Sequence, residues 1–206
     1  MSGLFVTFEG IDGCGKSTQV AEAARHLEHK GVPLLVTREP GGAPISEAVR
    51  RILLSPDNGE MCDLCEVLLY LAARAQHCSE KIAPALSEGR VVLCDRFQDA
   101  TLAYQGFGRG FPLDILGRMN EFATAGLAPG LTFVFDIDVG TSIARLKKAG
   151  KPADRLELSG REFYEKVRQG YLTLASRHPD RIVVLPGTAP VDDLAQSVME
   201  KIMSRL

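Results

Sequence analysis

The stretch FEGIDGCGKST, at residues 8–18, combines glycines with a lysine and two hydroxyl residues, which suits phosphate binding. From Gly10 to Ser17 it matches the pattern G-x-x-x-x-G-K-[ST]. Glycines let successive backbone N–H groups turn toward one anion, and a helix that starts there adds partial positive charge. The stretch therefore predicts a site for a nucleoside triphosphate with Mg²⁺.

Each position of this loop has an expected task. Lys16 is expected to neutralise the β- and γ-phosphates, and the Ser17 hydroxyl to bind Mg²⁺. The residues of the loop expected to bind the triphosphate are Gly10, Asp12, Gly13, Cys14, Gly15, Lys16, Ser17 and Thr18. Asp12 needs a separate explanation, because a carboxylate that pointed into the loop would repel a polyphosphate.

Two arginines follow apolar strands, at the point where each strand ends. Arg38 lies in TREPGG, and Asp95-Arg96 follows the run VVLC. Either arginine alone could form a surface ion pair, but beside a phosphate loop the pair favours a clamp for the phosphate of an acceptor and for the phosphoryl group in transfer. Asp95 is the preferred carboxylate for the metal, with Glu9 and Glu39 as alternatives.

Two further stretches could contact a substrate. Tyr70 and Arg74 are four residues apart in an expected helix, so they share a face and could hold a base by stacking and hydrogen bonds. A partly buried tyrosine beside a solvated arginine is the alternative. Residues 147–155 hold four basic side chains with Gly and Pro, which indicates either a solvated loop or a mobile segment over phosphates.

Alternating elements must position these residues. Strands are expected at residues 4–9, 33–37, 90–94, 131–136 and 182–185, and helices at 16–30, 43–54, 63–88, 112–125, 140–148, 161–177 and 191–205. Residues 106–110 and 149–153 are expected to be the loops that move most. Nearly continuous apolar strands separated by helices predict an α/β fold whose five-stranded parallel sheet is covered by helices on both faces. Such sheets bind ligands at the carboxyl ends of their strands.

Length and composition limit the remaining possibilities. A chain of 206 residues suits a single domain spanning 1–206. Its net charge of -2 gives no general reason to bind nucleic acid or an anionic membrane, and its apolar runs are too short or too charged for a leader or a span, so a cytoplasmic protein is expected. Of five cysteines, Cys62 and Cys65 could bind zinc with His77 and Cys78, but a reduced thiol pair is favoured.

Three classes of protein remain open from the residues alone. A phosphotransferase would use the arginines for its acceptor. A GTP-dependent switch should carry N-K-x-D for guanine, and the sequence contains no such string. An ATPase motor or assembly factor would place an acidic pair after a hydrophobic strand, where this chain has Asp95-Arg96. The residues favour the phosphotransferase.

Five ordered blocks narrow this further: FEGIDGCGKST, TREPGG, LYLAARAQH, DRFQDATLAYQG, and DRLE ahead of FYEKVRQGYL. Through them the sequence resembles the thymidylate kinase family, of the bacterial type, over essentially its whole length. The resemblance implies transfer of the γ-phosphoryl group of ATP to dTMP with Mg²⁺, on a P-loop kinase fold with a mobile lid. It also implies a homodimer, and we expect residues 63–88 to form part of the dimer face.

The resemblance assigns roles at the acceptor base. Tyr70 stands where the family has an aromatic ring that stacks on thymine, commonly Phe, and Arg74 where a side chain bonds the thymine carbonyl. Thr101 and Gln105 fall where bacterial members contact the base edge. Tyr104 falls where an aromatic ring packs on the deoxyribose and disfavours a 2′-hydroxyl.

It also assigns roles at the phosphates. Arg38 and Arg96 match the arginines of the acceptor phosphate, and Asp12 matches an acidic loop residue that contacts the acceptor sugar, with its carboxylate turned outward. The catalytic set expected from the sequence is Lys16, Arg38, Arg96 and Arg155. The alternative is another P-loop kinase, acting on a different (deoxy)nucleotide or on a nucleoside. A nucleoside kinase needs a base to take a proton from a hydroxyl, and Glu9 or Glu39 could serve.

The last expectation concerns a lid at about residues 147–157. Some relatives carry an arginine directly after the acidic loop residue, where this chain has Gly13. Relatives without it supply the charge from the lid, so Arg155 is the expected cation and Lys151 a helper at the ATP phosphates. Arg145, one helical turn before the lid, is expected near adenine.

Overall fold

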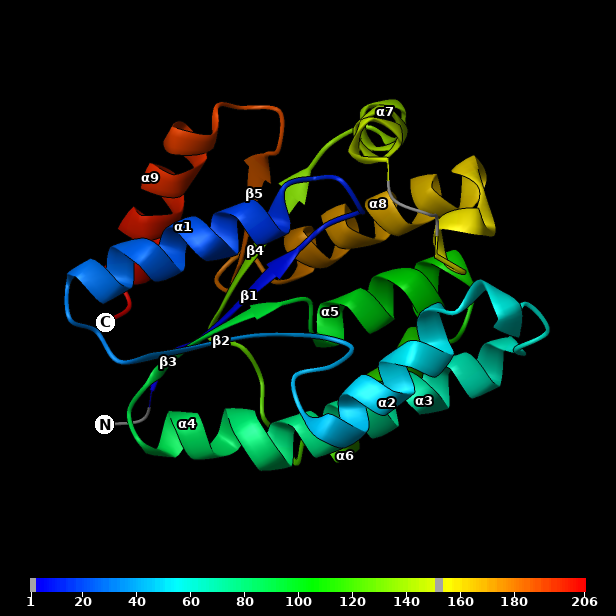
Figure 1. Ribbon diagram of the computed structural model, residues 1–206, viewed down its shortest axis with the longest axis horizontal. Helices are drawn as coiled ribbons and strands as arrows, with labels where there is room; N and C mark the ends of the chain where they lie inside the picture. Colours follow the sequence, from blue (N-terminus) through cyan, green and yellow to red (C-terminus); the bar gives the residue numbers. More distant parts are fainter. Residues whose placement is uncertain (1–2, 151–153) are drawn as a thin grey trace.

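The computed structural model in Figure 1 describes residues 3–150 and 154–206. Its centre is a parallel sheet with the strand order β2-β3-β1-β4-β5. The strands are β1 (Phe5–Glu9), β2 (Leu34–Arg38), β3 (Val91–Asp95), β4 (Leu131–Asp136) and β5 (Ile182–Pro186). The predicted five-stranded parallel sheet is confirmed.

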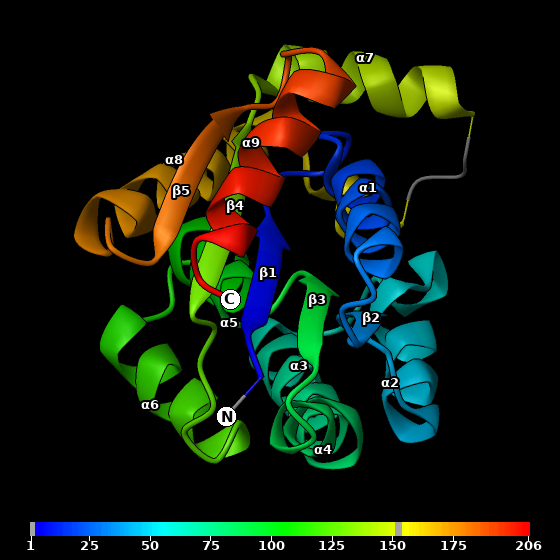
Figure 2. The same cartoon turned by 90° about the vertical axis from the view of Figure 1, so that its left-hand side faces the viewer.

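Helices connect successive strands and cover the sheet. They are α1 (Lys16–His29), α2 (Pro44–Leu54), α3 (Asp63–His77), α4 (Ala83–Ser87), α5 (Gln98–Thr101), α6 (Leu113–Ala123), α7 (Val139–Ala149), α8 (Arg161–Arg177) and α9 (Val191–Met203). Helices α1 and α9 pack together on one face, while α4, α5 and α8 lie on the other, as Figures 1 and 2 show from two sides. Among the helices of the described part, none is long and apolar enough to cross a membrane.

Burial follows this layering. Every residue of β1 is buried, and β3 and β4 are buried except at their last residue, because helices cover both of their faces. The outer strands β2 and β5 keep partly exposed side chains. Side chains that alternate along β1 therefore join different clusters: Val6 and Phe8 pack with α1, and Phe5 packs with Phe97 on the opposite face.

Two stretches differ from the sequence-based expectations. The single helix expected at residues 63–88 is divided: α3 ends at His77, a π-helical turn spans Cys78–Ile82, and α4 follows. Residues 106–110 were expected to be a mobile loop, but Leu102–Gly108 forms a π-helical stretch packed against α8. The packing is close, because a Cβ atom added to Gly170 of α8 would lie 2.8 Å from the Phe107 ring.

The strand order determines which loops meet. Strand β1 lies between β3 and β4, so the loop after β1 opens beside the carboxyl end of β3. In the registers, Asp95 is paired with Phe8 on one side and with Arg38 on the other. The phosphate-binding motif and both strand-end arginines therefore converge at one edge of the sheet, where parallel sheets bind ligands.

Candidate active site

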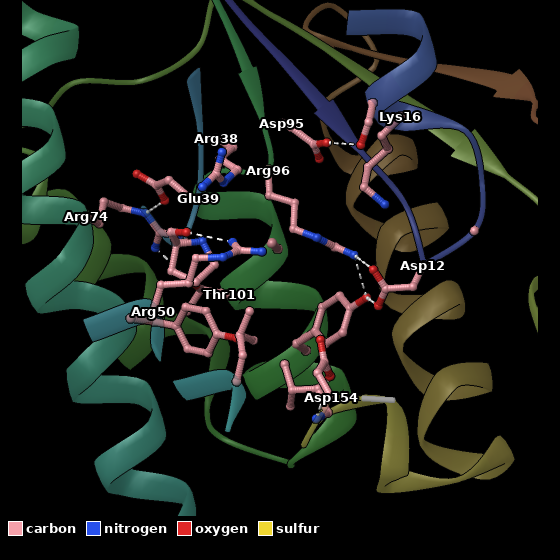
Figure 3. Close-up of a pocket in the computed structure, with 18 of the residues that line it drawn as sticks. Asp12, Lys16, Arg38, Glu39, Arg50, Arg74, Asp95, Arg96, Thr101 and Asp154 are labelled. Carbon is pink, nitrogen blue, oxygen red and sulfur yellow. Dashed lines mark hydrogen bonds and ion pairs between the residues drawn. The ribbon is translucent and has the colours of Figure 1, made fainter. Parts of the chain in front are cut away.

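A cavity of about 560 Å³ lies at the carboxyl ends of β1, β2 and β3 (Figure 3). The predicted residues that line it are Asp12, Gly13, Gly15, Lys16, Ser17, Thr18, Arg38, Tyr70, Arg74, Asp95, Arg96, Thr101, Tyr104 and Gln105. The loop, the arginines and the expected base-binding residues thus share one cleft. Of the other predicted residues, Gly10 and Cys14 belong to the loop but are not in the described lining, and Lys151 lies outside the described residues.

The phosphate loop joins β1 to α1 and has the backbone of an anion-binding turn. Gly10 has a φ of 130°, and a Cβ atom there would lie 2.7 Å from the Phe135 carbonyl oxygen, so only glycine fits. Lys16 is buried and donates from Nζ to the carbonyl oxygens of Gly10 and Ile11, at 3.1 Å each. These bonds hold the ammonium group over the loop, where it adds positive charge beside the backbone amides.

The side chains of Ser17 and Asp95 form a pair beside this loop. The Ser17 hydroxyl donates to Asp95 Oδ2 at 2.6 Å, across the short distance between α1 and the end of β3. Both offer hard oxygen ligands, which Mg²⁺ prefers. Within the described ranges no group of three His, Cys, Asp or Glu side chains is arranged to hold a metal. A hydroxyl and one carboxylate fit an ion that takes its other ligands from water and phosphate.

The predicted zinc alternative finds its four side chains in different surroundings. Cys62 and Cys65 are exposed at the start of α3, whereas Cys78 is buried. The His77 ring is committed to Thr37 Oγ1 at 2.7 Å and Glu39 Oε1 at 3.1 Å. The chain therefore does not gather these residues around one point.

Arg96 is the centre of the hydrogen-bond network in the cleft. It has a φ of 69°, a left-handed conformation that costs energy in a residue with a side chain. Its Nη2 donates to Asp12 Oδ1 at 2.6 Å and to the Tyr104 hydroxyl at 3.0 Å. Its Nη1 donates to the Gly10 carbonyl at 3.1 Å and to the Tyr171 hydroxyl at 3.2 Å. These bonds direct the guanidinium group toward the phosphate loop.

Asp12 faces this network and not the interior of the loop. Its Oδ2 accepts hydrogen bonds from Tyr104 at 3.2 Å and from Tyr164 at 3.1 Å. Burial alone would raise the pKa of Asp12, but Arg96, with help from Lys16, holds that pKa well below its usual range. Asp12 is therefore an ionised acceptor that sits between the loop and the far wall of the cleft.

Helix α8 supplies two residues of this network that we did not predict from the sequence. Tyr164 bonds Asp12, and the Tyr171 hydroxyl donates to Glu9 Oε2 at 2.8 Å. The two tyrosines are seven residues apart, so they lie on the same face of the helix. That spacing was visible in the sequence, but nothing local indicated that this face would meet β1 and the phosphate loop.

Glu9 is a fully buried carboxyl group at the end of β1. Its Oε1 accepts the Phe97 N–H at 2.7 Å, directly after Arg96, and its Oε2 accepts the Tyr171 hydroxyl. Burial and the charge of Asp99 raise the pKa of Glu9 from 4.5 to about 8, against the opposing effects of Arg96 and these hydrogen bonds. The stability of the fold should therefore depend on pH through this one group.

We expect Glu9→Gln to remove part of that pH dependence. Between pH 4.5 and about 8 the folded protein keeps a proton on Glu9 that the unfolded chain has released. The free energy of unfolding contributed by this group thus falls as pH rises, by about 1.4 kcal/mol per pH unit. Urea denaturation at pH 5, 6, 7 and 8 measures the difference between wild type and variant. A constant difference would contradict the prediction, and the exposed Glu28→Gln is the control.

The side of the cleft where we predict the acceptor is built around Arg74, which is 2% exposed. Its Nε donates to Glu39 Oε2 at 2.7 Å, its Nη1 to Thr101 Oγ1 at 2.8 Å and to Asn120 Oδ1 at 2.6 Å, and its Nη2 to the Phe97 carbonyl at 3.0 Å. The solvated arginine considered from the sequence is therefore not what the fold contains. One guanidinium N–H has no partner among the described residues, and Arg74 lines the cleft.

The other side chains predicted to bind the acceptor base are fixed by burial or by a hydrogen bond. Tyr70 is partly buried on the same face of α3 as Arg74, and Thr101 is buried beneath them. The Gln105 side chain donates from Nε2 to Glu66 Oε1 at 2.8 Å, which leaves its carbonyl end for the cleft. These side chains are already ordered before a ligand binds.

An arginine and an acidic residue that the sequence did not indicate also line the cleft. Arg50 of α2 donates to the Pro40 carbonyl at 2.7 Å, and burial and nearby Arg38 lower its pKa. Arg38 itself is half exposed and pairs with Glu47 at 3.0 Å. Asp154 also lines the cleft, on the side away from Arg38 and Asp95, as Figure 3 shows. No local motif marks Arg50, whereas Asp154 belongs to the DRLE block.

The remaining predicted cations lie elsewhere. Arg145 donates to the Gly13 carbonyl and to the Gly187 carbonyl, both at 3.1 Å, and so joins the phosphate loop to the segment after β5. Arg155 forms a buried ion pair with Glu66 at 2.6 Å and donates from Nε to the Leu53 carbonyl at 2.9 Å. Arg155 was expected at the phosphates, but in this structure its charge is neutralised by Glu66, and it is not among the described residues that line the cleft.

Comparisons with known proteins agree with this geometry. The family model described as thymidylate kinase matches residues 8–198. A thymidylate kinase of Geotalea daltonii is 48% identical over 210 residues, covering 99% of this chain and 98% of the relative. One of Pelotomaculum thermopropionicum is 50% identical over 185 residues, covering 90% and 86%. The crystal structure of a thymidylate kinase from Ehrlichia chaffeensis superposes with a TM-score of 0.79 at 32% identity, covering 98% of this chain and 99% of that one.

Proposed function

The chain belongs to the thymidylate kinase family, and from this premise we propose that its cleft transfers the γ-phosphoryl group of ATP to dTMP, giving dTDP and ADP. One observation supports this location more than any other: Arg96 faces Asp12 and the phosphate loop while Arg74, Thr101 and Gln105 line the same cavity. A donor phosphate site and an ordered polar base site thus share one cleft.

The donor occupies the phosphate loop in this proposal. The backbone amides of the loop and the α1 N-terminus hold the β- and γ-phosphates, and Lys16 turns its ammonium group from the Gly10 and Ile11 carbonyls toward them. Arg145 lies beside the adenine in this proposal, which is supported by the bonds that hold its side chain next to the loop, at the Gly13 and Gly187 carbonyls. These contacts neutralise the donor and fix its γ-phosphorus.

A magnesium ion fits the oxygen pair of Ser17 and Asp95. Ser17 and Asp95 would hold such an ion, which would supply positive charge next to the phosphates of the donor. In the proposal Ser17 contributes its hydroxyl, and Asp95 orients that hydroxyl and the surrounding water. Both residues are held by neighbouring main-chain elements, so the pair is ordered without the ion.

The acceptor occupies the other half of the cleft. Tyr70 stacks on the thymine, Arg74 donates its remaining N–H to a thymine carbonyl, and Thr101 and Gln105 meet the base edge. Tyr104 packs against the deoxyribose. Asp12 accepts a hydrogen bond from the 3′-hydroxyl, because its carboxylate already faces hydroxyl donors.

Arg96 and Arg38 bind the phosphate of dTMP and align it with the γ-phosphorus. The phosphate oxygen is itself the nucleophile and is already ionised, so the step requires no general base. Catalysis comes from alignment and from neutralisation of the oxygens in transfer. Arg38 must then exchange its exposed Glu47 partner for the phosphate, an exchange of small cost for a half-exposed pair.

The structure gives a reason to prefer this acceptor to a free nucleoside. A nucleoside kinase would need Glu9 or Glu39 as a base for a hydroxyl group. Glu9 is bonded to the Phe97 N–H and to Tyr171, and Glu39 to Arg74 and His77. Both side chains are buried and already bonded to other groups of the protein.

A coupled assay with purified protein tests the proposed function. ADP formation is measured with ATP, Mg²⁺ and each of dTMP, dUMP, dCMP, AMP and thymidine. We expect the highest kcat/KM with dTMP. Phosphorylation of thymidine without dTMP would support a nucleoside kinase, and ATP binding without any acceptor-dependent ADP would overturn the enzymatic role.

We further propose that residues 1–206 act as one kinase domain in the cytoplasm, with a lid at about residues 147–157. A lid is expected from the need to exclude water, because an open triphosphate site would hydrolyse ATP. Lys151 belongs to this region, outside the described residues. Both substrates are charged nucleotides, which supports the proposed location.

A homodimer through α3 and α6 is part of the proposal. These helices form an apolar groove of about 530 Å³, whose lining includes Leu68, Ile115, Met119 and Phe122. Phe122 is 91% exposed, which is unusual for a side chain of this size. A second copy of the same surface would cover it, as expected from the first part of residues 63–88.

We expect Phe122→Asp to produce a monomer. A charge at the centre of an apolar interface is strongly unfavourable, because it loses its water without gaining a partner. Size-exclusion chromatography with light scattering measures the mass. Met203→Glu is the matched control, because Met203 is an exposed apolar residue of α9. A wild-type monomer, or an unchanged dimer in the variant, would contradict the assignment of this face.

A further inference from the structure

Glu66 is a fully buried carboxylate in α3 that receives donors from separate parts of the chain. Its Oε1 accepts from Gln105 Nε2 at 2.8 Å and from Arg109 Nε at 3.4 Å. Its Oε2 accepts from Arg109 Nη2 at 3.1 Å and pairs with Arg155 Nη2 at 2.6 Å. We call Glu66, Gln105, Arg109 and Arg155 the Glu66 cluster.

The charge of Glu66 is maintained by these donors. Burial alone would raise its pKa, but the bonds from Gln105, Arg109 and Arg155 lower that pKa. The carboxylate is thus ionised, and removing Glu66 would leave the buried Arg155 without the carboxylate that it pairs with. A cluster of this kind is costly to disturb and therefore rigid.

One side of the cluster reaches the acceptor base site. Gln105 lines the cleft, and its Nε2 bond to Glu66 determines which end of the amide faces the ligand. Tyr70 follows Glu66 by four residues, so both lie on the same face of α3. The cluster therefore lies directly behind two of the residues assigned to the thymine.

The other side of the cluster holds the segment at residues 154–156. Arg155 is fastened at its side chain by Glu66 and by the Leu53 carbonyl, and at its backbone N–H by the Leu54 carbonyl at 3.3 Å. Its neighbours Asp154 and Leu156, like Leu54, line the cleft. The buried pair thus places part of the cleft wall opposite the phosphate loop.

We propose that Glu66 and Arg155 are positioning residues for the acceptor nucleotide: their buried ion pair orients Gln105 and fixes the cleft wall at residues 154–156. This inference rests on the proposed function. It replaces the expectation that Arg155 binds the transferring phosphoryl group. The two roles differ in which kinetic constant they affect.

An arginine on the phosphoryl group stabilises charge mainly in the transition state, so its removal lowers kcat and leaves the acceptor KM nearly unchanged. An arginine that positions the acceptor wall acts on the bound ground state as well, so its removal raises the KM for dTMP. The KM for ATP should change little, because the cluster touches neither the phosphate loop nor Arg145 in the described contacts.

The experiment compares Arg155→Met and Glu66→Gln with wild type in steady-state kinetics, varying dTMP and ATP separately. We expect each variant to raise the KM for dTMP about tenfold, with the KM for ATP within about twofold. Arg161→Met is the matched control, because Arg161 is an exposed arginine nearby in the chain, at the start of α8. Gln105→Ala is then added to either variant. The rise in the KM for dTMP should be smaller than the single-variant effects combined, because Arg155, Glu66 and Gln105 all act through the Gln105–Glu66 hydrogen bond.

Folding is monitored in parallel by circular dichroism and by Tm. Arg155→Lys keeps the buried charge with fewer donors, so it should fold and show a smaller rise of the same constant. A large loss of kcat with unchanged dTMP KM would overturn the proposal in favour of a phosphate role. A lowered Tm with unchanged kinetics would overturn it in favour of a purely structural role. A wild-type enzyme that prefers another acceptor would overturn the proposed function alone, and the same comparison is then made with that acceptor.

Discussion

Replacing Lys16 by methionine is expected to lower kcat about 10²- to 10³-fold. Lys16 is the ammonium group nearest the loop amides, and its Nζ is held by the Gly10 and Ile11 carbonyls. The methionine keeps the length of the side chain and removes the charge. Negative charge moves toward the leaving β-phosphate during transfer, so a cation fixed at this point stabilises the transition state more than bound ATP.

The measurement is steady-state ADP formation at saturating dTMP, combined with ATP binding by calorimetry. We expect kcat to fall much more than ATP affinity, because the backbone amides of the loop still hold the phosphates. Lys30→Met is the control, since Lys30 is exposed just beyond the other end of α1. If both variants retain wild-type kcat, the loop does not carry out the transfer.

Replacing Arg96 by methionine is expected to damage turnover and acceptor binding together, lowering kcat/KM for dTMP by about 10³-fold or more. Arg96 donates to Asp12, Tyr104, Tyr171 and the Gly10 carbonyl, so its loss affects both halves of the cleft. It also leaves Asp12 without its cation, next to the place where the acceptor phosphate binds. Repulsion between these two anions adds to the lost attraction.

Asp12→Asn separates the two contributions to this effect. It removes the negative charge but keeps a side chain that can accept a hydrogen bond from the 3′-hydroxyl. In the double variant with Arg96→Met, part of the lost dTMP affinity should return, because the uncompensated carboxylate is gone. Kinetics and dTMP calorimetry of the two single variants and the double variant measure this. An Arg96→Met enzyme with unchanged dTMP KM would contradict an acceptor-phosphate role for this arginine.

The loop that we propose binds the donor phosphates could be located from the sequence because its determinants are local. A β-strand, a glycine-rich turn and a helix start follow one another within residues 4–18, and the lysine and serine have fixed places in that turn. The parallel sheet could also be predicted from the sequence, because strands that are buried on both faces appear there as continuous apolar runs. Parallel strands place Arg38 and Arg96 at the same edge of the sheet as the loop, and the strand order β2-β3-β1 then brings them beside it.

The partners of the charged residues could not be predicted in this way. Arg74 could equally have been solvated, and only the packing of α3, α5 and α6 surrounds it with Glu39, Thr101 and Asn120. The π-helical stretch Leu102–Gly108 was expected in part as a mobile loop, because its glycines suggest flexibility until Phe107 is seen against α8. A local sequence pattern indicates which interactions a residue can form, whereas the packing of neighbouring helices decides which of them form.

By itself, the sequence determined the type of fold and the family and predicted a donor site, because these depend on short motifs, strand periodicity and the order of the blocks. The tertiary structure decided that Tyr164 and Tyr171 bond Asp12 and Glu9, and that Arg155 pairs with Glu66. These contacts join residues far apart in the chain. A buried charge must find its counter-charge among whatever side chains the packed helices bring near it, and no local sequence pattern specifies that partner.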